Sequence, residues 1–375
     1  MTIPRVALVA PVNLDRLSGT PVRAKTTARA LQERLSATIV ATGGSLPAQH
    51  VVEAWKPRGN RGLRFRLGFF TWGVLRILWQ QRPDIVHAVT PAALPAGLFY
   101  RLIARKTRLV FEVHGLIRYE MQQARLIARC VYRALDRLGL RFADVVIAMS
   151  EAQRNHLVSL YGLDSRRIHV LWGPVELREY PPVPVPGPAP RIRFGYLGGA
   201  SFWQDLRTIV AAAECLRDRK DIELLMAGVL PSEVDAAPPN MTFLGKIPIE
   251  EGVVFLHSCD VLLSPRLGGR VTDLQYPHKL SHYLAAGRPV IGAEVNDQAA
   301  IITRAQCGYT FSPGHVGSLV KAIERMASLS HRERTSMGEA ARTFAEEHLS
   351  VEHLLHALTA IYEEIRPAPR PKKGT

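Results

Sequence analysis

Short, continuous apolar runs alternate with amphipathic stretches along most of this chain. Six such runs lie in the first half, at residues 5–12, 37–42, 84–89, 109–115, 144–150 and 168–173. Six more follow in the second half, at residues 191–199, 222–229, 241–245, 260–265, 289–294 and 308–313. Continuous apolar runs are typical of parallel strands that helices cover on both faces. The pattern therefore predicts an α/β protein with two doubly wound parallel sheets.

Helical patterns lie between many of these strands. Apolar positions recur at helical spacing over residues 24–35 and again over 206–218. A third helix is predicted from Pro277 onwards, because proline suits the first helical position. Gly287 can end this helix in the left-handed conformation, and Pro289 then prevents it from continuing into the next strand.

The two series of strands are separated by YPPVPVPGPAP at residues 180–190, whose composition predicts a stiff, extended linker. We therefore expect an N-terminal domain over 1–179 and a C-terminal domain over 191–350. A helix over 351–366 and a flexible tail over 367–375 complete the prediction. Two Rossmann-like domains facing each other across a shared cleft are expected, since such sheets bind ligands at the carboxyl ends of their strands. The alternative is two domains with unrelated ligands.

The excess of positive over negative charge lies entirely in the first half of the chain. Residues 1–180 contain 27 Lys and Arg against 12 Asp and Glu, and the remaining 21 basic and 21 acidic residues cancel. An anionic partner would therefore meet the first half. Four scattered cysteines, without metal-ligand spacing, are typical of a reducing compartment. Neither a signal peptide nor an apolar run of transmembrane length is visible, which predicts a cytoplasmic protein.

Aromatic and basic side chains are interleaved in the stretch 55–83. The aromatic residues are Trp55, Phe65, Phe69, Phe70, Trp72 and Trp79, and the basic residues are Lys56, Arg58, Arg61, Arg64, Arg66 and Arg76. Residues 124–142 repeat the theme. Such segments bind the surface of an anionic membrane, which predicts a peripheral protein on the inner face of the cytoplasmic membrane. The alternative is a solvated arginine-rich face over a core helix. Nucleic acid is not favoured, because no DNA- or RNA-binding motif is visible.

Several stretches, taken in order, resemble the retaining glycosyltransferases of family 4, which have the GT-B fold. They are SGTPVRAKTTARALQ, FEVHG, residues 143–176, GYLGGASFWQDLRTIVAAAE, LLSPR and PHKLSHYLAAGRPVI. The resemblance implies transfer of a sugar from a nucleotide sugar to an acceptor, with retention of the anomeric configuration. It also implies that no metal or other cofactor is needed. In agreement, the sequence contains no D-x-D pair that could clamp a metal diphosphate.

In the first domain, the resemblance assigns diphosphate and sugar contacts to two places. The loop and first helical turn containing Gly19, Thr20 and Arg23 would approach the diphosphate, although a plain strand-to-helix turn is the alternative. His114 would contact the donor sugar, since a neutral imidazole can both donate and accept a hydrogen bond. Glu112, two residues earlier, would be its partner or a charge at the edge of the core.

In the second domain, the resemblance places the phosphates beside Gly198 and Gly199, which follow a strand. Family members commonly carry an Arg and a Lys here, whereas this chain has Ala200 and Gln204 around those places. Some members carry a Trp-Gln pair like Trp203 and Gln204. Trp203 could equally fill the core. Arg266, at the end of another strand, is a candidate replacement cation, and a solvated surface arginine is the alternative.

The helix that begins at Pro277 departs most from the family. Lys279 is predicted to contact a phosphate, and His278 lies on the same face as His282. His282 occupies the position of the second glutamate of a Glu-x7-Glu motif, whose carboxylate grips both ribose hydroxyls. The first glutamate is also replaced, and Asp273 is the nearest acid. An imidazole offers one acceptor where a carboxylate offers several, which predicts weaker nucleotide binding.

These patterns predict a hexosyltransferase-type enzyme that uses a nucleotide-sugar donor and a lipid-linked acceptor or cell-surface glycan precursor. His114, Lys279 and Asp273 are the candidate catalytic residues, and no metal site is expected. Two other interpretations stay open. The first, favoured by the replaced glutamates, is an inactive GT-B protein that binds a glycan or partner. The second is a GT-B enzyme that catalyses a different reaction, such as a nucleotide-sugar epimerase.

Overall fold

The computed structural model describes residues 4–16, 19–35, 37–46, 49–51, 63–116, 126–187, 189–235 and 237–366. The chain divides into two compact units. The first unit is formed by Met1–Trp172 together with Val351–Thr375, and the second by Gly173–Ser350.

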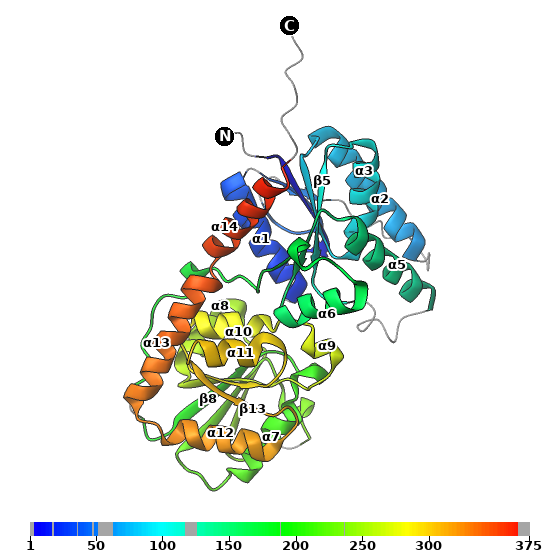
Figure 1. Cartoon of the computed structure of the whole chain (residues 1–375). Helices are drawn as coiled ribbons and strands as arrows, with labels where there is room; N and C mark the ends of the chain where they lie inside the picture. Colours follow the sequence, from blue (N-terminus) through cyan, green and yellow to red (C-terminus); the bar gives the residue numbers. More distant parts are fainter. Residues whose placement is uncertain are drawn as a thin grey trace. The chain divides into compact units, whose positions relative to one another are not determined.

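The first unit is built on a parallel sheet that is, over its described residues, 7-stranded with the order β3-β2-β1-β4-β5-β6-β7. Its strands are β1 (Val6–Asn13), β2 (Thr38–Gly43), β3 (Gln49–Val51), β4 (Ile85–Val89), β5 (Arg108–Val113), β6 (Val145–Ala148) and β7 (Ile168–Val170). Its helices are α1 (Gly19–Leu35), α2 (Leu63–Gln81), α3 (Leu94–Ile103), α5 (Leu126–Phe142), α6 (Glu151–Tyr161) and α14 (Val351–Glu364). Figure 1 shows α1 and α14 on one side of this sheet and α2, α3 and α5 side by side on the other.

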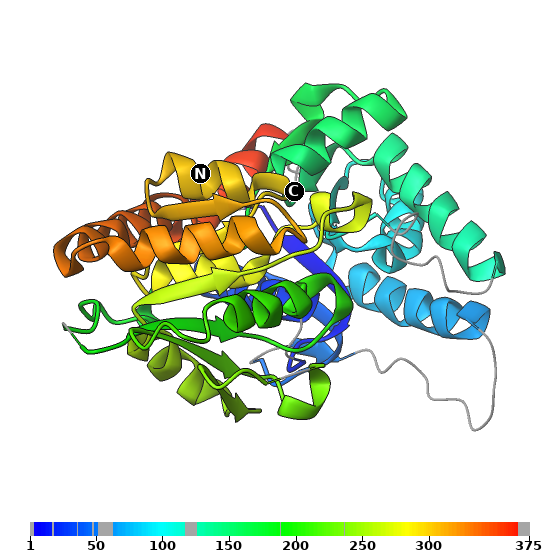
Figure 2. The ribbon, with the colours of Figure 1, turned by 90° about the horizontal axis from the view of Figure 1, so that it is seen from below.

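The second unit repeats this plan with a 6-stranded parallel sheet in the order β10-β9-β8-β11-β12-β13, counted over the described chain. Its strands are β8 (Ile192–Leu197), β9 (Ile222–Ala227), β10 (Met241–Gly245), β11 (Val261–Ser264), β12 (Val290–Ala293) and β13 (Gly308–Phe311). Its helices are α7 (Leu206–Cys215), α8 (Ile249–Ser258), α9 (Arg270–Asp273), α10 (His278–Ala285), α11 (Asn296–Arg304), α12 (Val316–Ser328) and α13 (His331–His348). Figure 2 shows the arrows of this sheet side by side, and its core includes apolar residues of β8, β9, α7 and α12.

The predicted fold is confirmed. Each of the twelve apolar runs contains a strand, and all the pairings between strands are parallel. The structure adds β3, a three-residue edge strand that apolar content alone does not reveal. The helix predicted from Pro277 is α10, with Pro277 one position earlier than expected, as its N-cap. Gly287 has the predicted left-handed conformation, with a φ of 64°.

The proline-rich segment at residues 180–190 is not where the two units divide. The second unit already begins at Gly173, and the segment belongs to that unit. Arg288 is fully buried and donates hydrogen bonds to the carbonyl oxygens of Val183 and Pro184 at 2.9 and 3.0 Å. The prediction of a linker here is corrected: the segment lies on the second unit and is held to it.

Arginine side chains hold this segment because prolines carry carbonyl groups but no N–H donors. Arg342 Nη1 donates to the carbonyl oxygens of Tyr180 at 2.6 Å and of Ala285 at 2.8 Å. His331 Nε2 lies 2.9 Å from the carbonyl oxygen of Pro186. Guanidinium groups with several fixed donors suit a carbonyl-rich segment of this kind. The composition of 180–190 shows that this segment lacks N–H donors. It does not show that Arg288, which follows α10, and Arg342 of α13 supply them.

Replacing Arg288 with methionine is expected to destabilise the second unit by about 3 kcal/mol or more. The change leaves several buried carbonyl oxygens without donors, including those of Cys259 and His257, which accept from Arg288 at 2.9 and 2.8 Å. For a unit of this size, such a loss lowers the melting temperature by roughly 6–12 °C. Thermal unfolding followed by circular dichroism measures the shift, with the exposed Arg325→Met as matched control. Equal melting temperatures for the two variants would contradict this role of Arg288.

Candidate functional site

Each sheet has one place where the strand order reverses and where open α/β sheets bind ligands. In the first sheet it lies between β1 and β4, and in the second between β8 and β11. Gly198 directly follows β8, and Arg266 lies two residues beyond β11. Two predicted site residues are therefore placed at the carboxyl ends of the strands that flank the second reversal point.

The turn at Gly198 lies against the ammonium group of Lys279. Gly198 has a φ of 149°, and a Cβ atom there would lie 2.9 Å from Lys279 Nζ. A Cβ atom at Gly228 would likewise lie only 2.7 Å from the carbonyl oxygen of Gly198. Lys279 Nζ also sits over the ring of Tyr196, 4.0 Å from its centroid. The glycines thus leave a narrow space at the end of β8 in which a cation is held over an aromatic face.

Arg266 and Lys279 are two covered basic side chains that form no ion pair among the residues that the structure describes. Lys279 Nζ and the Nε and Nη2 atoms of Arg266 are buried and form no hydrogen bond there. Burial lowers the pKa of Lys279 well below its usual value of 10.5, and the charge of Arg266 lowers it further. Burial also lowers the pKa of Arg266 to about 10, although Tyr196 and Asp273 act in the opposite direction. Such an arrangement favours a bound anion, which would stabilise the charged forms of both side chains.

Asp273, the last residue of α9, is close enough for its carboxylate to raise the pKa of Arg266. The structure thus places Asp273 near Arg266, whose charge in turn acts on Lys279. Gly199 is exposed, and its carbonyl oxygen accepts a hydrogen bond from the hydroxyl of Tyr196 at 2.9 Å. The ring beneath Lys279 is therefore fixed in place by the same turn.

The first turn of α10 packs on Gly173. A Cβ atom at Gly173 would lie 2.5 Å from His278 Nδ1, so only glycine fits there. The hydroxyl of Ser281 donates to the carbonyl oxygen of Gly173 at 2.7 Å and also contacts the hydroxyl of Tyr276 at 2.9 Å. Pro277 and His278 therefore help to fix the start of α10, which positions Lys279. Their predicted contact with a nucleotide sugar stays a prediction.

His282 is paired with a residue that the sequence did not suggest. The hydroxyl of Tyr180 and Nδ1 of His282 are 2.6 Å apart, and the two rings are tilted against each other. Burial lowers the pKa of His282 to about 4, so its ring is neutral at physiological pH. With Nδ1 engaged, only Nε2 is left for a further hydrogen bond, which is one contact where a carboxylate would offer several.

Trp203 and Gln204 lie in a short 3-10 helix, Phe202–Gln204, between β8 and α7. Trp203 is 36% exposed, which excludes simple core filling, and its carbonyl oxygen accepts from the backbone N–H of Leu267 at 3.0 Å. This bond ties the loop after β8 to the loop after β11. Gln204 Oε1 is buried without a hydrogen-bond partner in the described chain.

In the first unit, the three predicted phosphate residues differ in position. Gly19 and Thr20 open α1 at the surface, while Arg23 is fully buried. Arg23 Nε donates to Glu112 at 2.8 Å, and its Nη1 donates to the carbonyl oxygen of Trp172 at 2.5 Å. The charge of Arg23 is thus neutralised inside the unit, which sets it apart from Lys279 and Arg266.

His114 follows β5 and contacts the same carboxylate. Its Nε2 lies 2.5 Å from Glu112 Oε1, and His87 Nε2 lies 3.1 Å from Oε2. Burial alone would raise the pKa of Glu112, but Arg23 and the two histidines hold it well below its usual range. The alternative of Glu112 as the partner of His114 is confirmed. Sequence reasoning missed Thr90, which directly follows β4 and has a φ of 68°, a strained backbone position typical of binding sites.

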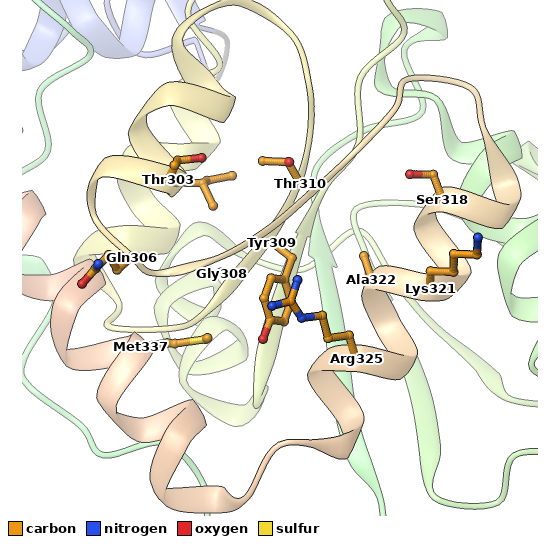
Figure 3. A pocket seen from close by; sticks show the side chains of 11 residues that line it. Thr303, Gln306, Gly308, Tyr309, Thr310, Ser318, Lys321, Ala322, Arg325 and Met337 are labelled. Carbon is orange, nitrogen blue, oxygen red and sulfur yellow. The ribbon is translucent and has the colours of Figure 1, made fainter.

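A separate hollow of about 490 Å³ lies at the edge strand β13 of the second unit. Figure 3 shows it between Thr303, Tyr309, Lys321, Arg325 and Met337, with Arg325 stacked on the ring of Tyr309 at 4.1 Å. None of the predicted site residues lines this hollow. Among the described residues, no cluster of three or more His, Cys, Asp or Glu side chains could hold a metal ion.

Comparisons with known proteins agree with this architecture. Residues 17–179 match the model of Glycosyltransferase Family 4, and residues 191–328 match that of Glycosyl transferases group 1. The chain is similar to sucrose-phosphate synthase from Thermosynechococcus elongatus, with 17% identity, a TM-score of 0.77 and coverage of 98% of this chain and 100% of that one. The comparison with curated proteins gives no match.

Two further solved structures share the fold. Anabaena Alr3699/HepE, in complex with UDP and glucose, has 17% identity and a TM-score of 0.72 over 96% of this chain and 100% of that one. WaaG, a glycosyltransferase involved in lipopolysaccharide biosynthesis, has 14% identity and a TM-score of 0.66 over 95% and 99%. The chain belongs to the family-4 glycosyltransferases and has the GT-B fold.

The neutral His282 makes the stability of the protein sensitive to acid. Its pKa of about 4 in the folded state lies below the usual 6.5, so the unfolded chain binds the proton more tightly. Stability is therefore expected to fall as the pH drops from about 6.5 to about 4, by up to roughly 3 kcal/mol. In His282→Gln, whose amide can still bond to Tyr180 but cannot titrate, this loss should be much smaller.

Urea unfolding between pH 7 and pH 4.5 measures this difference, and the exposed His356→Gln serves as the matched control. An acid-induced loss in His282→Gln as large as in the wild type would show that His282 is not the titrating group.

Proposed function

We propose that this glycosyltransferase is a retaining enzyme that uses a nucleoside-diphosphate sugar as donor and needs no bound metal. The observation that carries the proposal is the pair of unneutralised, buried cations, Lys279 and Arg266, beside the turn at Gly198. A sugar nucleotide leaves a diphosphate, and cations in a covered site stabilise the charge that develops on it. Two fixed cations can supply the charge that a metal ion supplies elsewhere.

In this proposal, His114 forms a hydrogen bond with the donor sugar. Its side chain is 6% exposed at the end of β5, and its Nδ1 is buried without a hydrogen-bond partner in the described part of the chain. A sugar hydroxyl would supply that partner. The structure of HepE with UDP and glucose supports a donor of this chemical class by analogy of fold.

Nucleotide binding tests the role of the cations. Lys279→Ala and Arg266→Ala should each weaken the binding of UDP or GDP by roughly 10- to 150-fold, since each removes a charge-assisted contact. Calorimetric titration measures this effect, and Lys321→Ala and Arg325→Ala in the hollow of Figure 3 are matched controls that should bind as the wild type does.

Turnover is expected to fall strongly in Lys279→Ala and in His114→Ala, with the fold intact. Full activity in either variant would reject the role given to that residue. Failure of the wild type to bind any nucleotide or nucleotide sugar would instead favour an inactive GT-B protein that binds a glycan or partner.

The acceptor is proposed to be lipid-linked, or a precursor of a cell-surface glycan, and to be met at the inner face of the cytoplasmic membrane. The support is a face of the first unit formed by α2, α3 and α5, which we call the exposed apolar face. It consists of Phe69, Trp72, Trp79, Phe99, Leu102, Ile103, Leu126, Ile127, Leu138 and Phe142, each at least 42% exposed. So many exposed apolar side chains on three neighbouring helices support an interaction site there.

Exposed basic residues accompany this face on the same helices and on the turn after α3. They are Arg76, Arg105, Lys106, Arg137 and Arg141. Apolar side chains flanked by cations fit the headgroup region of an anionic bilayer. No described helix is long and apolar enough to cross a membrane. Trp55 and the basic residues up to Arg61 lie outside the described residues, and so do the side chains of Arg64, Phe65 and Arg66.

Vesicle flotation tests the membrane proposal. The wild type should bind phosphatidylglycerol vesicles more strongly than phosphatidylcholine vesicles at low salt, because the cations attract anionic headgroups. Trp72→Ser combined with Leu102→Ser, whose side chains are 73% and 75% exposed, should weaken binding by about tenfold or more. Leu244→Ser combined with Val254→Ser, at exposed apolar positions of the second unit, is the matched control. Equal binding of both double variants would contradict the proposal.

A further inference from the structure

A buried carboxylate in the first unit is shared by three nitrogen-bearing side chains from three different elements. Glu112 of β5 is 1% exposed and contacts Arg23 of α1, His87 of β4 and His114 at the end of β5. His87 is held in turn by the hydroxyl of Tyr362 of α14, which lies 2.7 Å from its Nδ1. The acid thus links the helix after β1, the end of β5 and the C-terminal helix.

The charges in this cluster balance when both histidines are neutral. Arg23 neutralises the carboxylate directly, at 2.8 Å, and is itself fully buried. A further positive charge on His87 or His114 would be buried without an acid to compensate it, at a cost of several kcal/mol. A neutral imidazole at His114 has one protonated nitrogen and one acceptor nitrogen.

The carboxylate decides which nitrogen of His114 carries the proton. An ionised carboxylate can only accept hydrogen bonds, so Nε2 of His114, at 2.5 Å, must be the donor. Nδ1 then has a free lone pair, and this atom is buried without a partner in the described part of the chain. An unpaired buried acceptor at the carboxyl end of a strand is suited to a ligand that can donate one hydrogen bond.

We propose that Glu112 is a positioning residue, which holds His114 as the Nε2–H tautomer so that Nδ1 accepts a hydrogen bond from a hydroxyl group of the donor sugar. The inference rests on the proposed function for the identity of the ligand. It gives Arg23 a different task from the predicted phosphate contact: Arg23 neutralises Glu112 and ties it to the carbonyl oxygen of Trp172. In this proposal, the contact of His114 with the donor sugar depends on Glu112, which does not touch the sugar itself.

The tautomer can be measured without a ligand. Long-range proton–nitrogen correlation spectra of protein labelled with 15N-histidine distinguish a protonated ring nitrogen from an acceptor nitrogen, and the spectrum of His114→Gln identifies the signal. The wild type should show protonated Nε2 and unprotonated Nδ1 for His114 at neutral pH. The opposite tautomer, a mixture of the two, or a doubly protonated ring would overturn the inference.

A double variant, Arg23→Met with Glu112→Leu, removes the buried pair together and leaves no unpaired charge behind. Here His114 should become a mixture of tautomers, whereas the exposed His356→Ala control should leave its signal unchanged. Retention of a single Nε2–H tautomer in the double variant would show that Glu112 does not set it. If the double variant does not fold, the wild-type spectrum still tests the tautomer that the inference requires.

Binding separates this inference from the proposed function. UDP, UDP-glucose, UDP-galactose, UDP-N-acetylglucosamine, GDP and GDP-mannose are titrated into wild type, His114→Ala and the double variant. Both variants should bind the preferred nucleotide sugar about fivefold or more weakly than the wild type, yet bind the free nucleotide equally well. Loss of nucleotide and nucleotide-sugar affinity to the same extent, or no loss at all, would overturn the inference alone. Absence of binding to the wild type would overturn the proposed function and, with it, the assigned ligand.

Discussion

The second unit covers two basic side chains that form no ion pair within the described chain. Lys279 and Arg266 are covered by the turn at Gly198, by the ring of Tyr196 and by the loops after β8 and β11. Desolvation of such groups is unfavourable, and the lowered pKa values of both residues express this cost. The rest of the fold must offset it, through the buried core of the sheet and the anchored segment 180–186. A site of this kind is unfavourable when empty and becomes favourable when it binds an anion.

In the first unit, by contrast, the buried basic side chain has an acidic partner. The whole side chain of Arg23 is buried, as the Nζ atom of Lys279 is, but Glu112 neutralises Arg23 and also accepts a hydrogen bond from His114. The second unit therefore presents two basic side chains without an ion pair, which suits a diphosphate. The first unit presents an oriented acceptor nitrogen on His114, which suits a sugar hydroxyl. The pair of His282 and Tyr180 extends this neutral chemistry to the position where family members carry a carboxylate. In the proposed binding mode, the phosphates are expected to supply most of the binding energy and the ribose little.

The strands were predictable because covered parallel strands are continuous apolar runs, and residues 260–265 or 289–294 have no other interpretation at that length. Gly198, Arg266 and Lys279 could also be placed, since each follows or precedes a predicted strand. The sequence could not show which buried cation has a partner: Arg23 and Lys279 both lie in the first turn of a helix, and only the packing brings Glu112 to one of them. The segment 180–190 was misjudged for the same reason, because the donors from Arg288 and Arg342 come from residues that are distant in sequence.

Proton uptake on nucleotide binding tests the uncompensated charge most directly. Calorimetric titration of UDP or GDP above pH 8, in buffers of different ionisation enthalpy, counts the protons bound; the terminal phosphate is fully ionised there and does not contribute. A diphosphate next to Lys279 raises its lowered pKa, so the wild type should take up protons on binding, and Lys279→Arg, whose side chain stays protonated, should take up far fewer. Binding without proton uptake, or with equal uptake in Lys279→Arg, would contradict the account.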